Sequence, residues 1–136
     1  MSHRQVFPTR WNDNDVYGHI NNTIHYAAMD TTINTWMIAE GGLDIEAGDV
    51  MAVCASSSCT YLASAAFPDA MVVDLSVARL GSTSITWQLA ISRERDGLQL
   101  ATGRFVHVFV GRDSLRPVPI PERTRAAVES NLEVIA

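Results

Sequence analysis

A short polar segment near the N-terminus carries the residue types that could do chemistry. Between Asn12 and Asn22 it contains the carboxylate of Asp15 and, four residues later, the imidazole of His19. A carboxylate can activate water or attack an electrophilic carbon, and an imidazole can donate or accept a proton. Apolar residues at helical spacing begin at about Thr23, so backbone N–H groups at that helix start could stabilise negative charge on a carbonyl oxygen. The segment is therefore a candidate catalytic site with Asp15 as its leading residue.

The same side chains also suit a structural role. Asp13, Asp15, Asn21 and Asn22 are of the types that form turns and cap helices by bonding nearby backbone amides. Spacing alone therefore leaves catalysis and helix capping equally open.

The sequence lacks the motifs of several other kinds of active or binding site. The common signatures for serine hydrolysis, nucleotide binding and zinc are missing. A calcium loop starting at Asp13 would carry Tyr17 at its fifth position and Ile24 at its twelfth, where oxygen ligands are needed. We therefore expect no metal site and no bound cofactor.

Composition excludes further classes of function. The net charge is −5 and lysine is absent, which argues against binding to a nucleic-acid backbone. Cys54 and Cys59 lie on one expected strand, about 16 Å apart and on opposite faces, so they are predicted to be free thiols. No signal-peptide pattern opens the chain and no apolar run is long enough to span a membrane. We expect a cytoplasmic protein.

The pattern of apolar residues predicts an α+β protein with one domain over residues 1–136. A first strand is expected at 4–11, and a helix of about 18 residues then begins near Thr23 and stops at Gly41-Gly42. This helix is apolar over more than one stripe, which suits a helix wrapped by a sheet. Four antiparallel strands and a short terminal helix follow, at 50–62, 71–80, 84–93, 100–110 and 122–133.

Four motifs together resemble a known family. They are Arg10-Trp11-x-Asp13-x-Asp15-x-x-Gly18-His19-Ile20-Asn21-Asn22 followed by Tyr26, then Phe67-Pro68-Asp69, Leu80-Gly81-Ser82-x-Ser84 and Val118-Pro119-Ile120-Pro121. In order and spacing they resemble the 4-hydroxybenzoyl-CoA thioesterase-like branch of the hotdog superfamily, and they cover nearly the whole chain.

The resemblance implies a curved antiparallel sheet of about five strands wrapped around the long helix. It also implies a homodimer or homotetramer with active sites at the dimer interface, and hydrolysis of acyl thioesters of coenzyme A or acyl carrier protein. By this resemblance Asp15 is the nucleophile or general base, the backbone amide of Asn22 polarises the thioester carbonyl, and His19 belongs to the catalytic set.

Three further residues are candidates for substrate binding. Ser58 and Tyr61, on the second expected strand, could face the active site of a partner chain, or could only allow the helix to approach closely. Because lysine is absent, the phosphates of coenzyme A would have to meet arginines, and Arg79 is one candidate since a guanidinium binds phosphate oxygens in pairs.

Two alternatives to hydrolysis remain open. One is a hydratase or dehydratase on the same fold, although Gly18-His19-Ile20-Asn21-Asn22 matches the hydratase motif poorly. The other is a protein that binds acyl-CoA without turning it over, because a fold can hold a ligand without catalysis.

Overall fold

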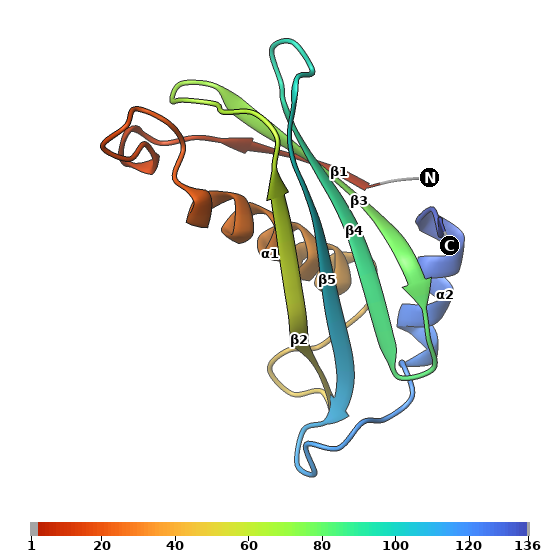
Figure 1. Cartoon of the computed structure of the whole chain (residues 1–136). Coiled ribbons are helices and arrows are strands. Elements are labelled where there is room, and N and C mark those ends of the chain that lie inside the picture. Colours follow the sequence, from red (N-terminus) through yellow and green to blue (C-terminus); the bar gives the residue numbers. More distant parts are fainter. Residues whose placement is uncertain (1–2, 136) are drawn as a thin grey trace.

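The computed structural model describes residues 3–135, in which five strands form one sheet and two α-helices pack against it (Figure 1). The strands are β1 (His3–Pro8), β2 (Val50–Tyr61), β3 (Ala70–Leu80), β4 (Ser84–Arg93) and β5 (Gln99–Gly111), and the helices are α1 (Asn22–Ala39) and α2 (Glu122–Asn131), with a 3-10 turn at Trp11–Asp13. The sheet has the order β1-β3-β4-β5-β2, and every neighbouring pair is antiparallel. The expected α+β layout is confirmed.

Local chemistry sets the limits of α1. The side chain of Asn21 accepts a hydrogen bond from the Thr23 amide at 3.0 Å and so caps the first turn. At the other end, Gly42 adopts a φ of +69°, a conformation that glycine tolerates best, and the chain leaves the helix. The helix has 18 residues, in agreement with the prediction.

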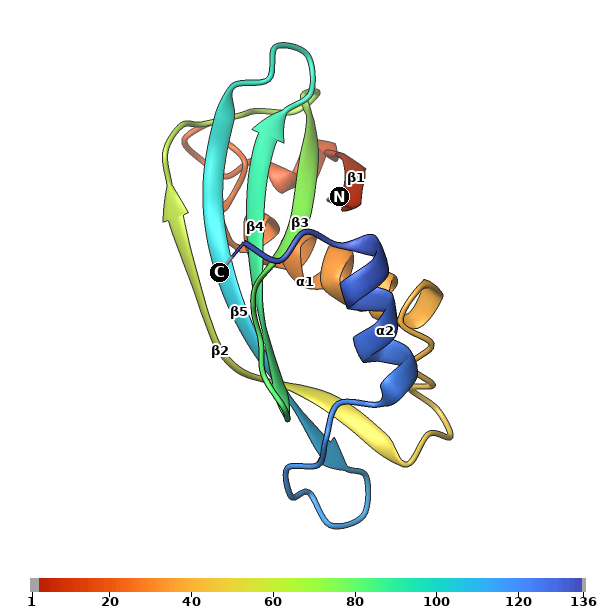
Figure 2. The ribbon, with the colours of Figure 1, turned by 90° about the vertical axis from the view of Figure 1, so that its right-hand side faces the viewer.

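The sheet curves around α1, and both helices lie on the same side of it (Figures 1 and 2). The core between them contains Met29, Ile33 and Trp36 of α1 packed against Trp87 and Phe109 of the sheet. A Cβ atom at position 103 of β5 would overlap the sulfur of Met29, so Gly103 lets the helix approach the strand. This is the hotdog arrangement that the resemblance implied.

The first strand ends earlier than predicted. β1 stops at Pro8, and the chain turns at Trp11–Asp13 instead of staying extended to Trp11. The cause is Asp13, whose carboxylate accepts hydrogen bonds from the Arg10 amide at 2.8 Å and from its guanidinium at 2.8 and 3.0 Å. These contacts draw the chain into a turn that leads directly to the polar segment.

A bulge in β2 changes which side chains face the helix. Cys54 is paired with His107 and Cys59 with Gly103, and the register shifts by one residue between them. Directly paired residues of antiparallel strands point to the same side, so both cysteines face the α1 side. The prediction that they face opposite ways is wrong for this reason. They are free thiols, and burial raises the pKa of each.

The C-terminal part of the chain, with α2, lies on the same side of the sheet as α1 (Figure 2). Thr124 of α2 donates a hydrogen bond to the carbonyl of Gly41 at 2.9 Å, which joins α2 to the end of α1. The last described residues run beside β3, where the Val77 amide donates to Glu133 and the Ile135 amide donates to Val77. Helix α2 therefore ends at Asn131, two residues before the predicted position.

Candidate active site

The polar loop before α1 is a fixed structure. The Asp15 amide donates to the His19 carbonyl at 2.8 Å, and the Gly18 amide donates to the Asp15 carbonyl at 3.0 Å. Gly18 has a φ of +80°, which closes this tight turn. The Asp15 carboxylate accepts from the Tyr17 amide at 2.9 Å and more weakly from the His19 amide at 3.5 Å. One carboxylate oxygen of Asp15 is thus oriented by backbone amides.

The two aspartates of the loop have different environments. Asp13 is only 4% exposed and its carboxylate binds Arg10. Burial alone would raise the pKa of Asp13, but the hydrogen bonds and charge of Arg10 outweigh burial and hold the pKa below its ordinary value. Asp15 is half-buried and makes no ion pair within residues 3–135. Asp13 is therefore structural, whereas Asp15 is available for chemistry.

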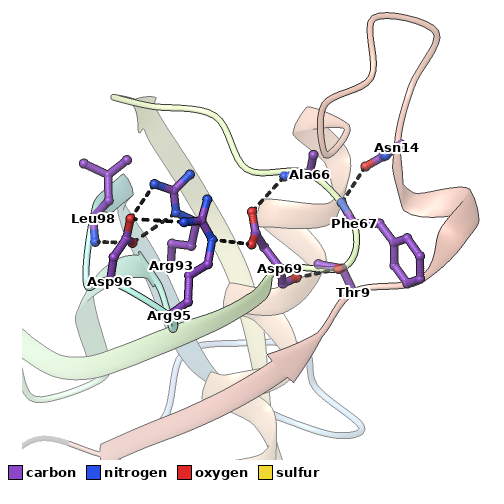
Figure 3. A network of polar contacts seen from close by, with 9 residues as sticks. All are labelled: Thr9, Asn14, Ala66, Phe67, Asp69, Arg93, Arg95, Asp96 and Leu98. Carbon is purple, nitrogen blue, oxygen red and sulfur yellow. Dashed lines mark hydrogen bonds and ion pairs between the residues drawn. The ribbon is translucent and has the colours of Figure 1, made fainter.

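A second loop, residues 62–69, holds the Asp15 loop in place (Figure 3). The Ile20 amide donates to the Ala65 carbonyl at 2.8 Å, and the Phe67 amide donates to the Asn14 side chain at 3.0 Å. Figure 3 shows the polar contacts continuing through Asp69, whose carboxylate accepts from Arg95 at 2.7 Å. Asn14, the residue before Asp15, is thus connected through the loop 62–69 to the hairpin between β4 and β5.

We expect Asn14→Ala to weaken this anchor. Loss of the partly buried hydrogen bond to the Phe67 amide should reduce the free energy of unfolding by about 1 kcal/mol. Displacement of the Asp15 loop should lower kcat by about tenfold or more. Urea unfolding and steady-state kinetics measure both effects. Arg95→Ala is the control, since Arg95 is 61% exposed and its ion pair should contribute little. An equal loss in both variants would contradict the argument.

A cavity of about 350 Å³ lies beside the Asp15 loop. Its volume is within the range of roughly 300–1,000 Å³ that is typical of small-molecule sites. The lining residues come from the Asp15 loop, the start of α1, the end of β2 and the loop after it: Asp15, Tyr17, His19, Ile20, Asn22, His25, Tyr61, Ala63 and Ser64. Four predicted site residues, Asp15, His19, Asn22 and Tyr61, are thus brought together.

The first residue of α1, Asn22, lines this cavity. Asn21 satisfies the amides of Thr23 and Ile24, because its side chain accepts from Thr23 and its carbonyl accepts from Ile24 at 2.9 Å. Within residues 3–135, no hydrogen-bond partner is found for the Asn22 amide. A free N–H at the positive end of a helix can stabilise a developing oxyanion.

Tyr61 closes one wall of the cavity. Its hydroxyl donates to the Asn22 carbonyl at 3.2 Å, and burial is the main cause that raises the pKa of Tyr61 to about 12. The phenol therefore stays protonated at neutral pH and acts as a donor. Tyr61 joins the end of β2 to the first turn of α1.

His25 is a lining residue that the sequence analysis did not identify. It lies on α1, three residues after Asn22, and is 3% exposed. Its Nδ1 lies 3.3 Å from the Asn21 carbonyl, and its ring meets that of Tyr61 edge-on, with the ring centroids 5.2 Å apart. The available signal was helical spacing, which puts residues 22 and 25 on one face of the helix.

Ser58 and Arg79 do not line this cavity of their own chain. Ser58 is paired with Arg104, next to the bulge, and therefore points to the face opposite the helix. Arg79 is exposed near the end of β3, nine residues beyond Ala70, or roughly 30 Å along the strand from the end where the Asp15 loop lies.

A second cavity, of about 210 Å³, lies between β1 and the opposite side of α1. Apolar side chains form most of its wall, among them Phe7, Ile24 and Met71, and the Arg10–Asp13 pair lies at its edge.

Among the described side chains, no group of three or more His, Cys, Asp or Glu residues could hold a metal ion. No helix within 3–135 is long and apolar enough to cross a membrane.

Two buried histidines predict a pH dependence of stability. Burial lowers the pKa of His25 and of His107 below 6.5. The unfolded chain therefore binds protons more readily, so their contribution to stability is complete above pH 6.5 and is lost as pH falls below it. We expect the free energy of unfolding to decrease between pH 7 and pH 5, by at most about 1.4 kcal/mol per pH unit for each histidine. Urea titrations across this range test the expectation, and a flat profile would contradict it.

Comparison with known proteins agrees with this geometry. Residues 9–128 match the family model of the thioesterase-like superfamily. The structure resembles that of the PA5185 protein from Pseudomonas aeruginosa strain PAO1, with 49% identity, a TM-score of 0.91 and coverage of 96% of this chain and 92% of that one. It also resembles the PA2801 protein of Pseudomonas aeruginosa, described as a candidate thioesterase, with 31% identity, a TM-score of 0.86 and coverage of 93% and 97%. No curated protein sequence matches the chain.

A more distant structure shares the fold. The 1,4-dihydroxy-2-naphthoyl-CoA thioesterase Slr0204 from Synechocystis has 18% identity, a TM-score of 0.87 and coverage of 96% of this chain and 98% of that one. The family match and the thioesterase relatives place the chain in the class of thioester hydrolases. The chain belongs to the thioesterase-like superfamily.

Proposed function

We propose that this protein hydrolyses an acyl thioester of coenzyme A or of acyl carrier protein to the free acid and the thiol, at the cavity beside Asp15. The observation that carries the proposal is that one cavity of about 350 Å³ is lined both by Asp15, which has a carboxylate, and by Asn22, whose amide has no hydrogen-bond partner within residues 3–135. Hydrolysis of a thioester needs these two elements, a group that brings the nucleophile and a donor that stabilises the oxyanion.

The mechanism follows from the roles of these groups. The thioester carbonyl oxygen accepts a hydrogen bond from the Asn22 amide, which polarises the carbonyl carbon. The Asp15 carboxylate then either deprotonates an attacking water or attacks the carbon itself, and in both cases the C–S bond breaks and the leaving sulfur takes up a proton to give the thiol. If Asp15 attacks directly, water then hydrolyses the resulting acyl–aspartyl anhydride, which gives the free acid and restores the carboxylate. His19 lines the same cavity, and in this proposal it donates a proton to the substrate or to the leaving sulfur. As proposed, these steps need no cofactor or metal.

The substrate class rests on chemistry and on relatives. Slr0204, which shares the fold, is named for an aromatic acyl-CoA substrate. Tyr61 and His25 line the cavity with aromatic rings, which suits an apolar acyl group. The phosphates of coenzyme A would require arginines, and Arg79 remains a proposed contact only if a second chain brings it near the cavity.

A panel of thioesters tests the proposed function. Free thiol is measured with straight-chain, branched and aromatic acyl-CoAs, and with the same acyl groups on carrier protein. We expect thiol release from at least one class. If no thioester releases thiol while an acyl-CoA raises the melting temperature, the protein is a binder and the proposal fails. Loss of an enoyl absorbance without thiol release would instead indicate a hydratase.

We further propose that the active form is a homodimer or homotetramer. β2 forms one edge of the sheet, and its 12 residues present an edge that no strand within residues 3–135 pairs with. Light scattering should give a mass of two or four chains, and the mass of a single chain at assay concentrations would contradict this. The cytoplasmic location expected from the sequence also remains a prediction.

A further inference from the structure

The cavity beside Asp15 has a buried end and an exposed end. Two of its lining residues, Ile20 and His25, are only 4% and 3% exposed and form the buried end. Tyr17 also lines the cavity but is 82% exposed, so it lies where the cavity opens to solvent. Asp15 itself is half-buried. A substrate that reaches Asp15 from solvent therefore enters at the end where Tyr17 lies.

The backbone of Tyr17 is fixed relative to the Asp15 carboxylate. The Tyr17 amide donates to that carboxylate at 2.9 Å, and the Gly18 amide donates to the Asp15 carbonyl at 3.0 Å. The ring of Tyr17 stacks on no other aromatic ring within residues 3–135. A loop with a defined position thus presents an accessible aromatic ring at the opening of the cavity, where a ligand can pack on it.

The two halves of a thioester substrate differ greatly in size. An acyl group can be small, whereas coenzyme A or a carrier protein is far too large for a cavity of about 350 Å³. The leaving thiol must therefore extend out through the open end while the carbonyl stays beside Asp15. The buried end, where Ile20 and the partly buried Ala63 belong to the lining, suits the apolar acyl group.

We infer that the thioester lies with its acyl group at the buried end, and that the ring of Tyr17 binds the arm of the leaving thiol where this arm leaves the cavity. The inference rests on the proposed function, because it assigns a role within the same reaction. The pantetheine arm, which coenzyme A and acyl carrier protein share, has methylene and amide groups that pack on an aromatic face. Tyr17 is thus a determinant of specificity for the leaving group and not for the acyl group.

The test compares two thioesters of the same acid, the coenzyme A thioester and the ethyl thioester, which lacks the pantetheine arm. Tyr17→Ala keeps the amide that donates to Asp15. We expect this variant to raise KM for the coenzyme A thioester about tenfold with kcat changed less than about twofold, because the lost contact is the same in the bound substrate and in the transition state. With the ethyl thioester, kcat/KM should change less than about twofold. Tyr17→Phe keeps the ring and should keep the wild-type KM for both substrates.

Trp11→Ala is the matched control, since Trp11 is 81% exposed but does not line the cavity, and it should leave KM unchanged. Three results would overturn the inference: a wild-type KM for the coenzyme A thioester in Tyr17→Ala, an equal loss of kcat/KM with both thioesters, or a KM that rises as much in Tyr17→Phe. A loss that follows the melting temperature would also count against it. If the wild-type protein releases thiol and only the effect of Tyr17→Ala is missing, the role of Tyr17 fails alone, whereas a wild-type protein that releases no thiol from any thioester removes the proposed function itself.

Discussion

Asp15→Asn should lower kcat by about a hundredfold to ten-thousandfold on the best thioester substrate. The substitution removes the charge and basicity of the carboxylate but keeps an oxygen that can accept from the Tyr17 amide. The loop and the helix cap should therefore stay in place, and the free energy of unfolding should change by less than about 0.5 kcal/mol. Steady-state kinetics with a thiol reagent and urea unfolding measure the two quantities on the same preparation.

The control for this substitution is Asp113→Asn. Asp113 is an exposed aspartate in the turn after β5, away from the loop, and receives the same chemical change. It should keep the wild-type kcat. The assignment of Asp15 would be contradicted if Asp15→Asn kept kcat, or if its loss of activity came with unfolding, because its hydrogen bonds within the turn would then explain the residue.

Trp87→Ala should have the largest effect on stability. Trp87 is fully buried on β4, and its ring contacts the ring of Trp36 with a centroid distance of 5.8 Å and the ring of His107 with one of 6.4 Å. Removal of the indole leaves a cavity between helix and sheet and should reduce the free energy of unfolding by about 3–5 kcal/mol. Chemical denaturation measures this loss.

Trp11→Ala is the matched control. Trp11 is 81% exposed and its ring lies nearly perpendicular to that of Phe67, so its removal should cost less than about 1 kcal/mol. Similar losses in the two variants would contradict the described core. The loss of stability in Trp87→Phe should lie between those of the two alanine variants, because the smaller ring still fills much of the space. The substitution also removes an indole N–H that has no partner within residues 3–135.

The elements with regular patterns were predictable from the sequence. β4 alternates Ile85, Trp87, Leu89 and Ile91 toward the core, and the structure has the predicted bounds for this strand. Helix α1 was predicted because its apolar spacing ends at two glycines. Periodicity reports which face is buried, and burial is what fixes these elements.

Irregular features of the chain were not predictable. β2 is rich in small polar residues, so no apolar alternation marked the bulge that puts Ser58 on the outer face. The first strand was extended too far because the effect of Asp13 on Arg10 depends on side-chain geometry. A bulge and polar contacts of this kind leave no periodic signal.

The candidate site was predictable in part. The loop residues Asp15, His19 and Asn22 are close in sequence, so their proximity follows from local structure. Tyr61 comes from a distant strand and was found by its residue type alone. His25 was missed because a histidine in an apolar helix usually has its polar atoms satisfied, and only the three-dimensional structure reveals the unpartnered Nε2.

The most direct measurement is hydrolysis of an active acyl thioester in ¹⁸O-labelled water, followed by mass spectrometry of the products. Attack of water at the thioester carbonyl predicts one solvent oxygen in the released acid and one free thiol for each acid formed. With Asp15→Asn, labelled acid should form at the strongly reduced rate. The account would be contradicted by a substrate that gains water without releasing thiol, or by labelled acid that forms at the wild-type rate in Asp15→Asn.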